Sequence, residues 1–504
     1  MAASPVAIIA ALVVIGLILG PVAALLGLGG DLPAPGPAEW LALRFTLLQA
    51  ALSASLSVAL AIPTARALAR RRFAGRRLLI TLLGAPFILP TIVAILGLLA
   101  VFGQNGALNA ALAPLGWRLN IYGLHGVVLA HVFFNLPLAT RMILQGWLAI
   151  PGERLRLAAG MDLSPAMVMR TLEVPMLARV VPGALAVIFV ICLSSFAVAL
   201  TLGGGPRATT LELAIYQALR FDFDVARAIT VALMQLGLAM AAGAVSLAFA
   251  RGAGFGAGLD RTVPRWDAAS PWLRAQDAAC IAAAALFLLA PLAMIAAKGA
   301  GTLAAQDPTL WRAAAHSLIV ATVSTALTLA WALALANRAG EWVALAGIAL
   351  SPLVLGMGLF LILRPFVSPL AVALPVTALA NALAALPFAV RILRPEAQTV
   401  REDYARLAQA LNLSPAVWLR RVLLPRLRRP LGFAAGLTAA LSMGDLGVIA
   451  LFADPDRATL PLYVYRLMGA YRMDEAAGAA LFLLLLCLGL FWLLDRGGRT
   501  DADA

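Results

Sequence analysis

Long apolar runs alternate with short polar connections along this chain. Most runs are roughly twenty residues long, the length that a helix needs to cross the hydrocarbon core of a bilayer. The pattern therefore predicts an all-α polytopic membrane protein with twelve spans, six in each half. The expected spans cover residues 5–30, 45–68, 79–102, 122–148, 180–202, 226–250, 278–297, 315–337, 342–363, 369–393, 430–453 and 477–495.

The composition supports this pattern. Of 504 residues, 62% are hydrophobic and 12% are charged, a balance that soluble globular proteins of this size do not show. The net charge of +14 is spread over short clusters between apolar runs, where basic residues set topology, so we expect contact with lipid and not with nucleic acid. The three cysteines lie inside apolar runs and indicate neither a disulfide framework nor a metal centre.

The basic clusters also predict an orientation. Five arginines within residues 69–77 should hold the connection after the second span in the cytoplasm. Counting spans from that point places both termini in the cytoplasm, together with the loops that follow the fourth and tenth spans. The first run is longer than a signal-peptide core and lacks a basic leader, so we interpret it as a retained anchor.

One polar stretch occurs twice. Residues 153–177 and 403–427 align without a gap, 250 positions apart, and both carry Arg-Leu-Ala, Leu-Ser-Pro-Ala, an arginine and a proline in that order. An internal duplication explains such a match. We therefore expect a first core (1–250), a cytoplasmic linker (251–277) and a second core (278–504). Each core crosses the membrane an even number of times, so the two share one orientation.

We call the repeated segments 153–175 and 403–425 the first and second elbow. Each should form a short helix, a tight turn and a second helix. Asp162 and Asn412 stand where the chain reverses, and both residue types tolerate the left-handed conformation. A serine should then cap the second helix, and a proline should fill its first position, where no amide hydrogen is needed. These pairs are Ser164 with Pro165 and Ser414 with Pro415.

The chain carries no Walker-type nucleotide loop, and its only lysine, Lys298, falls in an expected extracytoplasmic loop. We therefore expect no enzymatic activity from this chain. The elbows resemble the Glu-Ala-Ala loop in permease subunits of binding-protein-dependent ABC importers. The resemblance implies two fused type I permease cores, no cofactor bound by this chain, and elbows that couple to a separate cytoplasmic ATPase dimer using ATP and magnesium.

The resemblance assigns coupling roles position by position. The family's glycine corresponds to Asp162 and Asn412, and its glutamate to Arg156 and Arg406. The coupling candidates are Glu153, Arg156, Ala158 and Asp162 in the first elbow, and Asp403, Arg406, Ala408 and Asn412 in the second.

A second resemblance extends over nearly the whole chain. Residues 122–141, 202–219 and 444–452 resemble the fused permeases of thiamine and thiamine pyrophosphate ABC importers. This implies a bacterial inner-membrane location, a periplasmic thiamine-binding protein as a partner, and thiamine or its pyrophosphate as the substrate. Fused ferric-iron permeases are the alternative for the substrate. An ion-coupled secondary transporter is the alternative for the mechanism, although such proteins need several titratable groups in the membrane and Asp445 is nearly alone there.

The eleventh span holds the main candidates for the pathway. Small residues recur there every fourth position and predict a ridge that another helix can approach closely. Asp445 follows this ridge as an acid inside an apolar run, and its counterpart 250 positions earlier is Ser195. A carboxylate would suit a thiazolium cation; the alternative is that Asp445 only bonds a neighbouring helix or the backbone of its own half. The ridge residues are Gly432, Gly436, Ala440 and Gly444, and the further pathway candidates are Ser194, Ser442 and Phe196.

Four other polar or aromatic residues have structural interpretations. We expect His131 and Asn135 to form hydrogen bonds between packed helices, with a role in binding a ligand as the alternative. Tyr216 and Tyr465 should anchor at a membrane interface, with contact to a docking protein as the alternative. Residues 202–207, LGGGPR, predict a flexible turn near the outer mouth and not a nucleotide loop.

Overall fold

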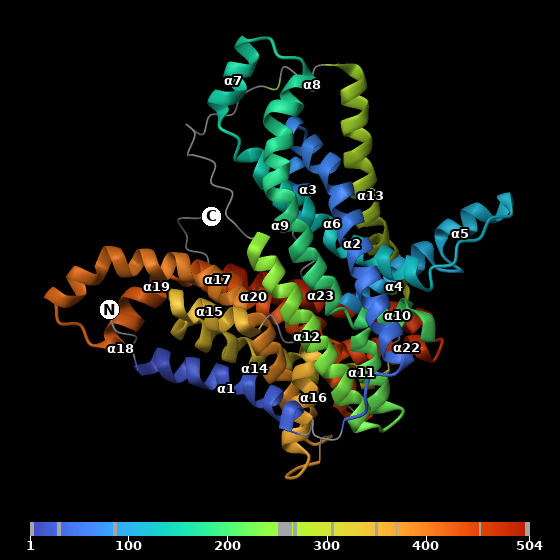
Figure 1. Cartoon of the computed structure of the whole chain (residues 1–504), viewed down its shortest axis with the longest axis vertical. Coiled ribbons are helices and arrows are strands. Elements are labelled where there is room, and N and C mark those ends of the chain that lie inside the picture. The colour runs from blue at the N-terminus through green and yellow to red at the C-terminus, as the bar shows by residue number, and fades with distance from the viewer. Residues whose placement is uncertain are drawn as a thin grey trace.

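The structure is a computed structural model that describes residues 5–27, 32–83, 88–249, 265, 270–303, 307–347, 351–368, 370–452 and 455–498. Every regular element within these residues is a helix, as the all-α prediction requires (Figure 1). The first half contains α1 Pro5–Gly27, α2 Pro37–Arg70, α3 Arg76–Leu82, α4 Thr91–Phe102, α5 Ala107–Leu112, α6 Leu124–Leu148, α7 Gly152–Gly160, α8 Pro165–Val168, α9 Val174–Leu193, α10 Ala197–Leu202, α11 Leu211–Arg220 and α12 Val225–Phe249.

The second half repeats this order. It contains α13 Pro271–Thr302, α14 Thr309–Ala334, α15 Arg338–Ala346, α16 Pro352–Leu363, α17 Ala373–Ala410, α18 Pro415–Val417, α19 Leu424–Arg426, α20 Arg428–Gly444, α21 Gly447–Phe452, α22 Leu460–Gly469 and α23 Met473–Gly498. Most of the expected linker, 251–277, lies outside the described residues, and its last part already belongs to α13.

Eleven helical segments of the described chain are long and apolar enough to cross a membrane, one fewer than the twelve expected. The difference lies in the ninth expected span, 342–363, which the structure divides between α15 and α16. Ser351 caps α16 by accepting a hydrogen bond from the amide of Val354 at 3.1 Å, and Pro352 fills the first helical position. Because proline cannot continue a preceding helix, these two residues begin a new one. The apolar α16 therefore stands, at 12 residues, where the ninth span was expected.

The first helix of each half lies against the other half. Helix α1 packs on α16, and α13 packs on α4. A proline of each arm meets a glycine of the helix that it covers: a Cβ atom on Gly358 would lie 2.4 Å from Cβ of Pro21, and one on Gly97 would lie 2.7 Å from the carbonyl oxygen of Pro291. Only glycine permits these approaches. The exchange of arms ties together two halves that are separate along the sequence.

The two halves meet at one end and diverge toward the elbows. In Figure 1 they share a region around α10, α11 and α22, while α7 and α8 stand at the top and α18 and α19 at the left. The largest buried apolar cluster contains residues of both halves, among them Phe196 and Ile215 of the first and Phe452 of the second. The shared region is thus a packed junction, and the elbows are its two distant extremities.

Candidate functional site

The turn of each elbow has the same backbone. Asp162 and Asn412 adopt φ angles of 48° and 45°, as the sequence predicted. In the first elbow, the amide of Leu163 donates to the carbonyl of Ala158 at 3.1 Å and the amide of Asp162 donates to that of Ala159 at 3.0 Å. The second elbow repeats both bonds, from Leu413 to Ala408 and from Asn412 to Gln409. This is the Schellman arrangement, which satisfies the last carbonyls of a helix through one left-handed residue.

The helix after each turn also begins in the predicted way. Ser164 accepts a hydrogen bond from the amide of Met167, and Ser414 from that of Val417, each at 3.4 Å. A π-helical turn follows in both halves, at Met169–Glu173 and Trp418–Leu423. Each π turn lies just before a repeated proline, which removes one amide donor and displaces the carbonyl four residues earlier. These prolines are Pro175 and Pro425.

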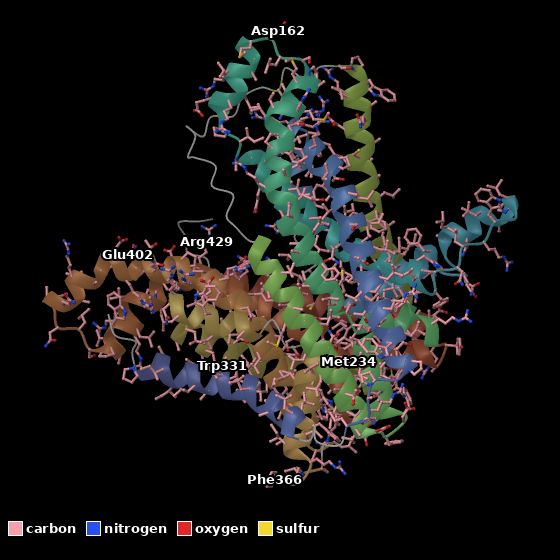
Figure 2. The ribbon with its side chains drawn as sticks, viewed as in Figure 1. Asp162, Met234, Trp331, Phe366, Glu402 and Arg429 are labelled. Carbon is pink, nitrogen blue, oxygen red and sulfur yellow. The ribbon has the colours of Figure 1, made fainter. Side chains whose placement is uncertain are left out.

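The predicted coupling residues surround these turns. Arg156, Arg406 and Asp403 are exposed, and Figure 2 shows Asp162 at the outermost point of the first elbow. Ala158 is buried, with 4% of its surface exposed, because it lies beneath the turn. The other predicted coupling residues fall into two groups: Glu153 and Ala408 are half-buried, while Asp162 and Asn412 are exposed.

The elbows also present apolar side chains that sequence reasoning did not single out. Leu157 and Met161 of the first elbow are 66% and 63% exposed, and Leu407 and Leu411, at the equivalent positions of the second, are 51% and 61% exposed. In each elbow an exposed arginine, Arg156 or Arg406, directly precedes the first residue of the pair. Apolar groups that protrude repeatedly at the same positions mark a contact surface more often than chance exposure does. We call these four residues the elbow apolar pairs.

The two elbows are attached to the rest of the protein differently. Glu173, 1% exposed, receives bonds from the guanidinium groups of Arg66 at 2.7 Å and Arg265 at 2.8 Å, and Arg70 lies 3.6 Å away. The equivalent residue of the second elbow is Leu423. It is buried in a small apolar cluster with Ala336, Ala397, Val400 and Leu427.

A cavity of about 320 Å³ lies at the junction of the two halves. The predicted pathway residues Ser194, Ser195, Phe196 and Asp445 all line it. Ser442 does not: its hydroxyl accepts a hydrogen bond from the side chain of Asn381 at 3.0 Å and faces the packed interior. The predicted site is therefore brought together except for this one serine.

Helix breaks place these groups at the cavity. Helix α9 ends at Leu193 and α10 begins at Ala197, while α20 ends at Gly444 and α21 begins at Gly447. One carboxylate oxygen of Asp445 accepts a hydrogen bond from the amide of Gly447 at 3.1 Å, an interaction typical of a chain reversal. Interrupted helices are tolerated at membrane depth where they line a cavity, and these two do so.

Glu212 is the functional candidate that sequence reasoning missed. It belongs to α11, is 0% exposed, and lines the same cavity as Asp445. The expectation that Asp445 is nearly alone as an acid is therefore wrong. The available signal was an acid between leucines in the apolar stretch 211–219. It was overlooked because that stretch follows a loop and is too short to be a span.

The structure also places the polar and aromatic residues for which the sequence predicted structural roles. His131 shares a hydrogen bond with the hydroxyl of Ser53 in α2 at 3.2 Å, and Asn135 donates one to Sγ of Cys192 in α9 at 3.4 Å. Both residues therefore connect packed helices as expected, although both also line the cavity. Tyr216 is 7% exposed and packs edge-on against Phe196, so the interface role expected for it is wrong.

The small-residue ridge packs as predicted. A Cβ atom on Gly432 would meet the carbonyl of Leu494 at 2.7 Å, and one on Gly436 would meet the ring of Phe491 at 2.9 Å, so α20 and α23 are in close contact. Gly444 lies against Pro90 of the first half in the same way. Among the described residues no group of three potential metal-ligating side chains occurs.

Fold and site together define a class: a polytopic membrane permease with two homologous halves, a cavity between them and paired elbows. No family model matches the chain. The chain is 39% identical to the thiamine transport system permease protein ThiP of Escherichia coli (strain K12), across 92% of this chain and 90% of that protein. It is 37% identical to ThiP of Brucella abortus (strain 2308), across 92% and 89%. The chain belongs to the ThiP family of thiamine transport system permeases, which confirms the resemblance to fused thiamine permeases.

Proposed function

We propose that this chain forms the translocation pathway of an ATP-driven importer for thiamine and thiamine pyrophosphate in the bacterial inner membrane. A periplasmic binding protein delivers the substrate, and a separate cytoplasmic ATPase supplies the energy. The substrate assignment is supported by relatives over nine-tenths of the chain that are named as thiamine transport permeases. Those names favour thiamine over ferric iron.

The observation that carries the ATPase-driven mechanism is the pair of elbows. Their turns share the same hydrogen bonds and left-handed residue, and each presents an exposed arginine followed by two exposed apolar side chains. Two copies of one shape suit two copies of one partner, as an ATPase dimer would provide. An ion-coupled transporter has no use for such a repeated surface.

The arrangement of the halves supports alternating access. They are packed around the junction cavity and diverge toward the elbows (Figure 1). With both elbows and both termini in the cytoplasm, the opening between the halves faces inward. Two ATPase subunits that close around ATP and magnesium draw the elbows together, and this motion turns the cavity toward the periplasmic side. The exchanged arms α1 and α13 keep the halves joined during the movement.

Reconstitution tests the proposal directly. The purified chain is placed in proteoliposomes with the ATPase and the thiamine-binding protein of the same transport system, and uptake of radiolabelled thiamine is measured with and without ATP. We expect uptake only when both partners and ATP are present. Uptake driven by a proton or sodium gradient without the ATPase would overturn the mechanism, and uptake of ferric iron in place of thiamine would overturn the substrate.

A further inference from the structure

The junction cavity is lined by two acids, and three of their four carboxylate oxygens have no hydrogen-bond partner among the described residues. Both carboxylate oxygens of Glu212 are buried without a hydrogen-bond partner, and so is one oxygen of Asp445. Ser351 and Gln235 approach Glu212 without hydrogen-bond geometry. A buried carboxylate without a partner is strongly unfavourable, so native proteins retain one mainly where a ligand or a proton completes it.

The local backbone favours the charged form of Glu212. The residue lies in the first turn of α11, whose amide groups give a partial positive charge, and Thr210 caps that turn by accepting a hydrogen bond from Leu213 at 3.3 Å. The helix end stabilises the carboxylate, and both of its oxygens lie buried in the wall of the cavity without a hydrogen-bond partner. No lysine or arginine is among the described residues that line the cavity.

The other lining residues indicate what kind of cation fits. Phe134 and Phe196 line the cavity and offer aromatic surface, which attracts cations with delocalised charge. The remaining polar lining groups are neutral, among them Ser194, Ser195 and Asn135, and no group of three acidic, histidine or cysteine side chains occurs among the described residues, so the lining does not build a calcium or magnesium site. The volume of about 320 Å³ falls at the lower end of the range of roughly 300–1,000 Å³ for small-molecule sites. A small aromatic cation satisfies all three conditions.

We infer that the junction cavity is a binding site for an aromatic organic monocation, which is held between Glu212 of the first half and Asp445 of the second. This inference rests on the proposed function, in which the cation is the thiazolium ring of thiamine during passage. It adds a preference: the anionic pyrophosphate of the phosphorylated substrate meets two acids in the cavity, so the site binds free thiamine more tightly than thiamine pyrophosphate.

The two acids come from positions that are not equivalent. The counterpart of Asp445 is Ser195, and the counterpart of Glu212, 250 positions later, is Leu462. One acid from each half therefore reaches the cavity from a different element, α11 on one side and the break after α20 on the other. Relative movement of the halves changes the separation of the acids, so the site should release its cation when the halves change position.

Equilibrium binding tests the site without requiring transport. The permease and its ATPase are purified in nanodiscs without the binding protein, and radiolabelled thiamine, thiamine pyrophosphate and a neutral thiamine analogue with thiophene in place of thiazolium are compared. We expect Glu212→Gln and Asp445→Asn each to weaken thiamine binding by about tenfold or more, the effect of losing one charge-assisted interaction. The wild type should bind the neutral analogue as weakly as the two variants bind thiamine. Glu212→Gln should leave the affinity for the neutral analogue unchanged.

A matched control distinguishes the effect of removing a charge at the cavity from the effect of removing a buried acid elsewhere in the protein. Glu39 is also buried, but its carboxylate is bonded to Arg227 at 2.7 Å and it does not line the cavity. Glu39→Gln should leave thiamine affinity unchanged. If Glu212→Gln does not fold, Glu212→Leu, which copies the other half, and the analogue series on the wild type still decide the question.

The outcomes distinguish the site from the proposed function. Three results would each overturn the proposed site. The wild type binds thiamine and the neutral analogue with equal affinity, Glu212→Gln leaves the affinity for thiamine unchanged, or the wild type does not bind thiamine. If ATP-dependent thiamine uptake persists although one of these results is obtained, the proposed import function stands and only the binding site is rejected. Cation binding that depends on both acids, without any thiamine uptake by the complete system, leaves the site and removes the proposed function.

Discussion

The two elbows share one turn but differ in how they are attached. Both turns place a left-handed Asp or Asn in a Schellman arrangement and begin the next helix with a capping serine. The first elbow is fixed by Glu173 among arginines, and the second by Leu423 in an apolar cluster. The turn itself is therefore the same in both copies, whereas its attachment to the rest of the protein uses different chemistry in each half.

The helix that leads into each elbow differs as well. In the first half α6 ends at Leu148 and α7 begins at Gly152, after Pro151. In the second half α17 runs without a break through the equivalent Arg401 and Glu402, and Arg401 donates a hydrogen bond to the carbonyl of Ala336 at 3.0 Å. A proline followed by glycine favours a break, and an arginine followed by glutamate favours a continuous helix.

The largest expected effect comes from the charged attachment. Replacing Glu173 with leucine, the residue of the other half, leaves Arg66 and Arg265 without their carboxylate, and we expect the free energy of unfolding to fall by about 3–5 kcal/mol. In the apolar attachment, Leu423→Met retains the volume and should cost less than about 1.5 kcal/mol. Thermal unfolding of both purified variants measures the two stability losses. A Glu173→Leu protein as stable as the wild type would contradict the expected difference between the charged and the apolar attachment.

The next largest effect concerns the leading helices. Arg401→Pro with Glu402→Gly copies the first half into the interior of α17 and should cost about 3 kcal/mol, since proline there removes a backbone hydrogen bond and clashes. Pro151→Arg with Gly152→Glu should instead join α6 to α7. Spin labels at positions 141 and 157 of that variant, with native cysteines replaced, should then be separated by about 24 Å, the length of 16 helical residues.

Labels at 391 and 407, the equivalent positions within the continuous α17, are the internal control for that distance. An unchanged distance between 141 and 157 after the double substitution would show that the break in the first half does not depend on Pro151 and Gly152.

A smaller effect should be equal in the two halves. Valine at Asp162 or at Asn412 cannot relax at a positive φ angle, so each substitution should cost about 1–2 kcal/mol, while glycine at either position should be neutral or stabilising. Unfolding temperatures of the four single variants provide the measurement. Unequal costs for the two valine variants would mean that the turns are less alike than their hydrogen bonds indicate.

The smallest effect is expected at the caps. Ser164→Ala and Ser414→Ala each remove one exposed hydrogen bond of 3.4 Å, so each should lower stability by about 0.5–1 kcal/mol, the lower part of the range for such caps. Hydrogen exchange of the amides of Met167 and Val417 should increase in the matching variant only. Increased exchange in both elbows after a single substitution would contradict local action.

The sequence predicted the elbows well because their determinants are local. A left-handed Asp or Asn, a capping Ser and a Pro at the first helical position act within a few residues, so the pattern alone is informative. The attachments could not be predicted in the same way. Glu173 gains its partners from residues more than 90 positions away along the chain, and no local pattern reveals such a contact.

The span count and the cavity show the same limit. Twelve spans were expected from apolar length, but Ser351 and Pro352 begin a new helix inside one run. Asp445 was found because an acid in an apolar run is conspicuous. Glu212 was missed, and Ser442 lies outside the lining of the cavity, because only the packing of α11 and α20 decides which side chains face the cavity.

The proposed coupling role of the elbows requires both of them to contact an ATPase on the same side of the membrane. Single cysteines at Leu157 and Leu407, in a chain without native cysteines, are exposed to a membrane-impermeant maleimide in inside-out vesicles with the ATPase present or stripped away. If the elbows couple to the ATPase, both positions are labelled in stripped vesicles and both are protected when the ATPase is bound. Labelling of either position only from the periplasmic side, or equal labelling with and without the ATPase, would contradict this coupling role.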